Sequence, residues 1–275
     1  MRALLKKKTL WFVLYGIFIT VVFLYLLFPG ELVKNRLERA INSSQLSLRS
    51  SSLHLSFPLG IKLKNVVVST TSPADVLFQG EVLKAQIALS SFFRKLTYIG
   101  LKGKAYGGSF GGNVGVFSLN RPYPPAEMKL NFKNIDVRRI SLVRKELGDD
   151  LTGKASGAIN YSAEASGRIT AGDVQVFLDE GTYSLAEPFL GIDKIDFDKG
   201  EIRASFSSGD IKLERLEIYG QRLNCFLSGN IIPATNNFQG SRLNLNGTIE
   251  LLGKDTITMK VTIGGTVSNP VFKYI

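Results

Sequence analysis

The chain has 275 residues and a formal net charge of +11, from 34 Lys and Arg against 23 Asp and Glu. This length allows one domain with a substantial core plus an attachment. The basic residues are scattered, which argues against a nucleic-acid-binding protein, whereas a mildly basic exterior suits anionic lipid or an acidic partner. Cys225 is the only cysteine, so the chain has no internal disulfide and no C-x-x-C metal or redox site.

Residues 9–30, TLWFVLYGIFITVVFLYLLFPG, contain no charged side chain. As a helix they would extend roughly 33 Å, enough to cross a hydrocarbon core of about 30 Å. The alternatives are a buried helix or a cleaved signal peptide, but a signal peptide has a shorter apolar run and a small-x-small cleavage site. The positive-inside rule keeps the four basic residues of segment 1–8 in the cytoplasm. We therefore expect a cytoplasmic tail over 1–8, a transmembrane signal anchor over 9–30, and residues 31–275 on the far side of the membrane.

The segment after this apolar run has the pattern of a short amphipathic helix. Its apolar residues fall near one face: Leu32, Val33, Leu37, Ala40 and Ile41. Pro29 suits either the first turn of this helix or a kink in a longer one. The favoured interpretation is a helix that closes one end of the domain core. In the other interpretation, its basic residues contact anionic lipid headgroups.

From about residue 46 onward, apolar residues recur with a period of two. The clearest example is Ile257, Met259, Val261 and Ile263, which alternate with polar residues. The same alternation occurs at Ile202, Ala204 and Phe206, at Val174, Val176 and Leu178, at Leu53, Leu55 and Phe57, and at Leu130 and Phe132. Strands with one apolar and one polar face belong to antiparallel sheets that face water on one side. The fold class predicted is mainly β.

Few helices are expected in the part after the anchor. Segment 138–150 (RRISLVRKELGDD) predicts one helix, and segment 90–96 (SSFFRKL) another turn or two. With so little helix to cover it, the apolar face must pack against another sheet, curve on itself, or bind an apolar molecule. We therefore expect a long, curved antiparallel sheet that forms an open barrel or a groove.

A glycine followed two residues later by a β-branched residue recurs toward the C-terminus. Gly229, Gly247 and Gly265 begin such copies at intervals of 18 residues. This interval predicts equivalent points of successive hairpins, where glycine permits a bend, a bulge or a positive φ. Coincidence in a glycine-rich β sequence is the alternative, because other copies are irregularly spaced.

Taken in order, several stretches resemble a known family. They are LFPGELV, FPLGIKLKNVVV, GKAYGGSFGG, LTGKASGAINY, FDKGEIRASFSSGDIKLERLEIYG and GTVSNP. The chain resembles the type II secretion system protein N family, whose exported domain is similar to β-rich AsmA-like envelope proteins. The resemblance implies a single-pass protein of the bacterial inner membrane, with most of the chain in the periplasm, that assists protein export. The AsmA-like kinship implies a second function, a sheet that cradles lipid acyl chains.

Two stretches invite a chemical interpretation and do not support it. The glycine cluster Gly103–Gly115 lacks the phosphate-loop pattern, because Tyr98 replaces the first glycine and Ala105 replaces the hydroxyl residue. The acidic run Asp193, Asp196, Asp198 and Glu201 departs from the calcium-loop pattern, because Gly200 replaces a ligand. We expect bent strands at the first stretch, and a solvated strand and turn at the second.

The remaining candidates for chemistry are His54 and Cys225. His54 lies between Leu53 and Leu55 on a predicted strand, facing solvent, and Cys225 fits a small apolar strand residue. We expect no catalytic residue, no cofactor and no metal ligand, and therefore no enzyme.

Two classes of function remain. One is a structural or interaction module of type II secretion, whose partners are other components of the secretion system. The other is lipid binding or transfer, with phospholipid in an apolar groove; in both, residues 9–30 contact membrane lipid.

Overall fold

The computed structural model describes residues 11–16, 18–20, 22–23, 26–42, 46–56, 60–71, 75–88, 95–118, 125–147, 151–166, 168–189, 192–207, 209–234 and 238–274. The strands are β1 (Leu46–Arg49), β2 (Ser52–Ser56), β3 (Gly60–Thr70), β4 (Val76–Ile87), β5 (Thr97–Ala105), β6 (Gly108–Val116), β7 (Glu127–Asp136), β8 (Lys154–Ala163), β9 (Ile169–Phe189), β10 (Ile192–Ser207), β11 (Asp210–Gly220), β12 (Leu223–Ile232), β13 (Arg242–Leu251), β14 (Ile257–Gly265) and β15 (Pro270–Tyr274). The helices are α2 (Gly30–Ile41), η2 (Val137–Arg139), α3 (Ser141–Leu147) and η3 (Phe238–Gly240).

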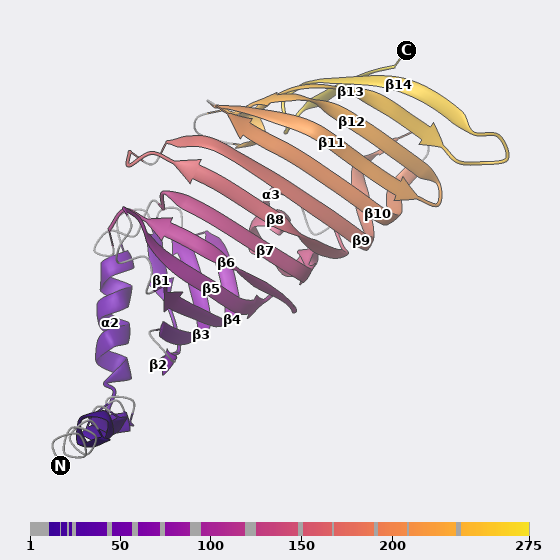
Figure 1. Ribbon diagram of the computed structural model, residues 1–275. Helices are drawn as coiled ribbons and strands as arrows, with labels where there is room; N and C mark the ends of the chain where they lie inside the picture. The colour runs from indigo at the N-terminus through magenta and orange to yellow at the C-terminus, as the bar shows by residue number, and fades with distance from the viewer. Residues whose placement is uncertain are drawn as a thin grey trace.

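The strands form one long antiparallel sheet. From β3 to β15 each strand pairs with its neighbours in the chain, and β1 and β2 both pair with β3, along different halves of it. Figure 1 shows the strands side by side in chain order, from β2 and β3 next to α2 to β14 at the far end. The sheet does not close into a barrel. The predicted curved antiparallel sheet with few helices is therefore confirmed, in its open form.

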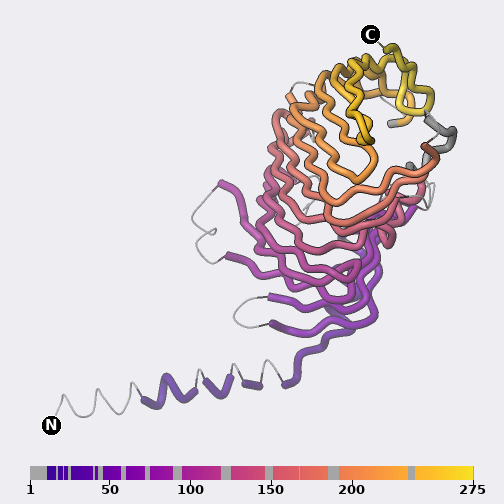
Figure 2. Tube along the Cα trace, turned by 90° about the vertical axis from the view of Figure 1, so that its right-hand side faces the viewer, coloured from indigo at the N-terminus to yellow at the C-terminus, as the bar shows by residue number. Residues whose placement is uncertain are grey.

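The sheet bends sharply along a line that crosses its strands. At this line strands carry two successive exposed residues between residues that face the core, as at Lys64–Asn65, Lys133–Asn134 and Asp179–Glu180. Asn65, Asn134 and Glu180 have positive φ angles of 48°, 56° and 40°. An irregularity of this kind bends a strand and lets apolar residues before and after it lie on the same side. Figure 2 shows the resulting curvature of successive strands.

Helix α2 packs on the concave side of the sheet at its N-terminal end. Val33, Leu37 and Ile41 contact a cluster of buried residues that includes Leu53 and Val66. The prediction that this helix closes one end of the core is confirmed. The assignment of Leu32 to the apolar face is wrong, since its side chain is 69% exposed. The helical conformation is interrupted before α2, whose N-cap residue is Pro29. The proline therefore stands at the start of a new helix.

The predicted anchor is only partly described. The chain is helical at 11–16, 18–20 and 22–23, whereas segment 1–10 and the positions between these pieces lie outside the described residues. Within the described part of the chain, no helix reaches the length and apolarity that crossing a bilayer requires.

The helix predicted over residues 138–150 is shorter than expected. The first residues form η2, where the Asp136 carboxylate accepts a hydrogen bond from the Arg138 N–H at 3.1 Å. Ile140 is extended, so α3 begins only at Ser141. The short helix predicted over 90–96 falls mostly on residues 89–94, which lie outside the described residues.

The interval of 18 residues between successive glycines corresponds to one strand and one turn, rather than to a whole hairpin. Gly229, Gly247 and Gly265 lie on the consecutive strands β12, β13 and β14. The prediction of equivalent points on successive hairpins is therefore wrong, because the strands here are about as long as two predicted ones. The expected return of a β-branched residue to the core is confirmed for Ile231 and Ile249, which both belong to the C-terminal apolar cluster.

Candidate functional site

The concave face of the sheet carries two unbroken rows of apolar residues and glycines. One row crosses the strands from β2 to β15 through directly paired residues: Leu55, Ile61, Ala85, Leu101, Gly112, Leu130, Ile159, Val174, Ala204, Leu213, Gly229, Leu245, Ile263 and Phe272. The adjacent row contains Leu53, Leu63, Leu83, Gly103, Phe110, Phe132, Gly157, Val176, Ile202, Leu216, Leu227, Gly247, Val261 and Tyr274. We call the two rows together the apolar strip.

The apolar strip belongs to a hydrophobic core on both sides of its middle. On the N-terminal side α2 covers Leu53 and Leu63, which are both 3% exposed. On the C-terminal side Leu245, Val261 and Ile263 belong to a buried cluster, whereas Phe272 and Tyr274 on the edge strand β15 are exposed.

Between these two buried parts the strip is only partly buried. The ten residues that β5 to β9 contribute belong to neither buried cluster: Leu101, Gly103, Phe110, Gly112, Leu130, Phe132, Gly157, Ile159, Val174 and Val176. Among the described helices, α2 contacts β1 and β2, and α3 contacts β4 and η2. We call these ten residues the open section of the strip. A continuous apolar surface of this kind marks a site of interaction with another apolar body.

The glycines of the open section are required by close approach of the neighbouring strand. A Cβ atom at Gly112 would lie 1.9 Å from the carbonyl oxygen of Lys129, and one at Gly157 would lie 2.1 Å from that of Gln175. Neither distance is possible for a real side chain, so these positions admit only glycine without a shift of the backbone. At two of these glycines a phenyl ring fills the space above the backbone, since a Cβ atom at Gly103 would lie 2.6 Å from the Phe110 ring and one at Gly157 would lie 3.0 Å from the Phe132 ring.

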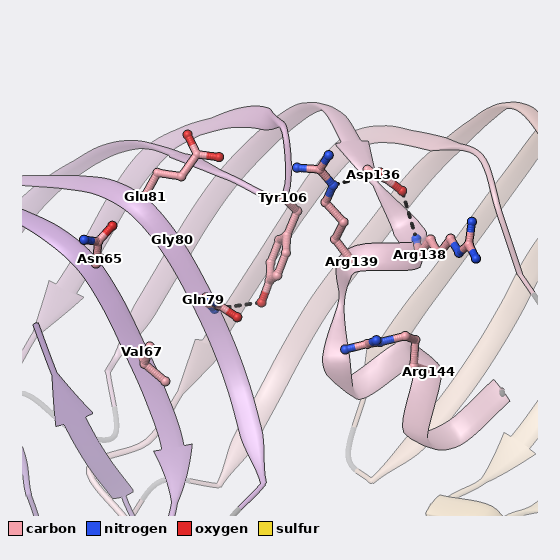
Figure 3. Close-up of a pocket in the computed structure, with 10 residues that line it drawn as sticks. All are labelled: Asn65, Val67, Gln79, Gly80, Glu81, Tyr106, Asp136, Arg138, Arg139 and Arg144. Carbon is pink, nitrogen blue, oxygen red and sulfur yellow. Dashed lines mark hydrogen bonds and ion pairs between the residues drawn. The ribbon is translucent and has the colours of Figure 1, made fainter. Parts of the chain in front are cut away.

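Next to the open section, the neighbouring strands β4 and β5 are paired along only part of their length. The hairpin of β5 and β6 ends at Tyr106 and Gly107, so β5 pairs with β4 only from Val82 onward. The earlier residues of β4 pair with β3 alone. The gap that results is a cavity of about 700 Å³, lined by Asn65, Val67, Gln79, Gly80, Glu81, Tyr106, Asp136, Arg138, Arg139 and Arg144. We call this cavity the notch; Figure 3 shows its residues.

Tyr106 stands between the notch and the apolar strip. Its hydroxyl oxygen accepts a hydrogen bond of 2.7 Å from the Gln79 N–H, in the place of the missing strand partner. Its ring contacts Phe78 edge-on, with centroids 6.1 Å apart, and Phe78 in turn contacts Phe110 of the open section at 5.5 Å. Burial raises the pKa of the Tyr106 hydroxyl, which therefore stays protonated and keeps a hydrogen to donate.

Three arginines and two carboxylates line the notch. The Nε atom of Arg139 pairs with the Asp136 carboxylate at 3.0 Å, which leaves the two terminal nitrogens of Arg139 for other partners. Within the described part of the chain, no carboxylate lies within ion-pair distance of Arg144. Figure 3 shows the Arg139 and Arg144 side chains extending toward Tyr106 and β4, whereas Arg138 points away.

The convex face is polar, and its charges differ between the two halves of the sheet. On neighbouring strands Lys62, Lys84 and Lys102 lie directly opposite one another, and we call this row the lysine ladder. None of the three forms an ion pair with a described residue. On the C-terminal half, by contrast, Glu201 pairs with Arg203 at 3.0 Å and with Arg215 at 3.7 Å.

The acidic run and the glycine cluster form strands. Asp193, Asp196, Asp198 and Glu201 lie along β10, where Asp196 pairs with Lys194 at 3.3 Å. In the described part of the chain no group of His, Cys, Asp and Glu residues is arranged to hold a metal ion. The cluster Gly103–Gly115 forms most of the hairpin of β5 and β6, which contains strands, as expected, and no helix N-terminus for a phosphate.

His54 and Cys225 lie on opposite faces of the sheet. His54 is exposed on the convex face and is paired with Lys62 across β2 and β3, as the alternation predicted. Cys225 packs against the C-terminal apolar cluster. Burial raises the pKa of its thiol to about 11, which makes it a poor nucleophile at neutral pH.

The arrangement of the notch was not anticipated from the sequence. The three arginines lie in the segment predicted as a helix, and Tyr106 lies in the glycine cluster that was interpreted as bent strands. The one sequence signal that could have located the end of this hairpin is Gly107, since glycine is common in tight turns.

Comparison of the chain with protein-family models, with curated proteins and with solved structures returned no match. The site is therefore interpreted from its own geometry.

Proposed function

We propose that the open section of the apolar strip binds the acyl chain of a membrane lipid. The observation that carries this proposal is the unbroken apolar surface that remains only partly buried between two buried clusters. A face of a sheet that is in contact with water normally carries polar side chains, because exposed apolar area is unfavourable in water.

The dimensions of the open section support an acyl chain. Its five strands, β5 to β9, span about 19 Å because neighbouring strands lie about 4.8 Å apart. A saturated chain with C–C bonds of about 1.5 Å advances about 1.25 Å per methylene, so about 15 methylenes match this length. If half of each methylene leaves water, contact contributes about 0.4 kcal/mol per methylene, or about 6 kcal/mol before the cost of association.

The proposal includes the location and the anchor. Residues 9–30 would hold the chain in the bacterial inner membrane, with residues 1–8 in the cytoplasm and the sheet in the periplasm. In this position α2 and the N-terminal end of the strip lie next to the membrane that supplies the lipid. The protein has no enzymatic role in this proposal.

The test is photo-crosslinking in the membrane. A photo-reactive amino acid is placed at Leu130, in the open section, or at Asn131, the next residue, which is exposed on the convex face. We expect lipid adducts by mass spectrometry of the full chain at position 130 and not at position 131. Equal labelling at the two positions, or none at 130, would refute lipid binding on the strip.

A second function is favoured by the edge strand of the sheet. Strand β15 is the last strand of the sheet, pairs with β14, and has all five of its residues, Pro270–Tyr274, exposed. An exposed edge strand is a natural docking site for a strand from another protein. We propose that this edge binds a component of a type II secretion system, as the family resemblance implies.

The two functions are separated by a second crosslinking position. A photo-reactive residue at Val271 on β15 should capture a secretion component, identified by mass spectrometry, whereas one at Lys254 in the turn before β14 should not. Capture of no secretion component at Val271 would remove the second function and leave lipid binding unaffected.

A further inference from the structure

We infer that the notch binds the phosphate group of an amphiphile whose acyl chain lies in the open section of the apolar strip. This inference rests on the proposed function and extends it, because it names the headgroup chemistry. It assigns the contacts to Arg139, Arg144 and Tyr106.

The first argument is the supply of hydrogen-bond donors. Asp136 occupies only the Nε atom of Arg139, and no described carboxylate pairs with Arg144. The Tyr106 oxygen already accepts the Gln79 N–H, so its own hydrogen is available to a ligand. Two guanidinium groups and a hydroxyl therefore line one cavity, and guanidinium groups bind phosphate oxygens through two parallel N–H donors.

The second argument is the charge of the cavity. The charge of Arg139 is offset by its partner Asp136, whereas no described carboxylate lies within ion-pair distance of Arg144. A phosphodiester carries one negative charge at neutral pH. Its binding would supply the missing anion for Arg144, whereas a cation would be repelled by this guanidinium group.

The third argument is the continuity between the notch and the open section. The Tyr106 ring contacts Phe78, and Phe78 contacts Phe110 of the open section, so the two sites are separated only by a layer of aromatic rings. The notch exists because the hairpin of β5 and β6 is shorter than its neighbours, which interrupts the wall beside the middle of the strip. A headgroup in the notch is therefore within reach of a chain on the strip.

We expect both the phosphate headgroup and the acyl chain of the ligand to contribute to its affinity. Arg139 and Arg144 are partly exposed to water, which weakens their attraction for a free phosphate ion. The acyl chain holds the phosphate near both arginines and so raises its effective concentration there. We therefore expect a strong preference for a phosphate attached to a chain over inorganic phosphate alone.

The experiment compares two ligands that differ only in the phosphate. The full chain is reconstituted in phosphatidylcholine nanodiscs with a trace of diazirine-labelled hexadecyl phosphate or of diazirine-labelled hexadecanol. Photolabelling of β5 to β9 is measured by mass spectrometry. We expect about tenfold more labelling with hexadecyl phosphate. In the variant Arg139→Gln/Arg144→Gln this preference should disappear while labelling with hexadecanol is unchanged.

The matched control is Arg168→Gln/Arg222→Gln, which removes the same charge from exposed positions outside the notch and should keep the preference. Equal labelling by the two ligands in the unaltered chain would overturn the headgroup inference and leave acyl binding intact. Labelling by neither ligand would overturn both. If an equal concentration of inorganic phosphate abolished labelling by hexadecyl phosphate, the notch would be a site for the free ion. This result would overturn the inference that the ligand is an amphiphile.

Discussion

The substitution Leu130→Glu places a carboxylate at the centre of the open section. Leu130 lies on β7, the middle strand of β5 to β9, between Gly112 and Ile159 in its row. A carboxylate must remain hydrated, so an acyl chain would lose contact with about the central third of the open section. Loss of about 5 methylene contacts at about 0.4 kcal/mol each removes about 2 kcal/mol. This corresponds to about a 30-fold loss of affinity.

The assay is photolabelling of the full chain in nanodiscs by a trace of diazirine-labelled hexadecanol, for which labelling is proportional to affinity. The matched variant is Asn131→Glu, which adds the same charge on the convex face and should label like the unaltered chain. Leu130 is partly exposed and Asn131 is exposed, so both variants should remain folded, and urea unfolding checks this for each. Full labelling of a folded Leu130→Glu variant would show that the chain does not lie on the strip.

Three further outcomes test the sheet itself. The variant Gly247→Ala should lose about 3 kcal/mol in the free energy of unfolding, because a Cβ there would lie 1.8 Å from the Phe226 carbonyl oxygen; Gly264→Ala, with its nearest contact at 4.0 Å, is the tolerated control in urea unfolding. The variant Lys84→Glu, in the middle of the lysine ladder, should raise the free energy of unfolding by about 1 kcal/mol at low salt and less at high salt; unchanged stability at low salt would contradict repulsion along the ladder. Because burial raises the pKa of the Cys225 thiol to about 11, iodoacetamide should modify the folded protein at pH 8 far more slowly than the urea-unfolded protein; equal rates would show that the thiol is exposed.

The strands were predictable because their pattern is local. Alternation over a few residues is enough to assign Val261 and Ile263 to a core face, and both are buried. The same holds for α2, where Val33 and Leu37 follow the helical period and contact the core. The error at Leu32 arose at the edge of the apolar face, where a small rotation of the helix about its axis decides between contact and exposure.

The interval between the glycines shows that local sequence pattern did not predict the length of the strands. The interval of 18 residues was read as a whole hairpin because the expected strands were short. The observed strands are about 10 residues long in this region, so the same interval moves the chain by one strand. Strand length depends on how far each neighbour continues to supply hydrogen bonds, which is a property of the sheet.

The sequence alone determined the mainly β class, the strand faces and the short helix that closes one end, because each depends on residues close together in the chain. The apolar strip and the notch were decided only by the tertiary structure. The strip depends on the pairing register across every strand, which brings residues of distant segments into one row. The notch depends on a contact between Tyr106 and Gln79 and on where one hairpin stops relative to its neighbours. Such contacts join distant segments, so no periodicity in the chain reports them.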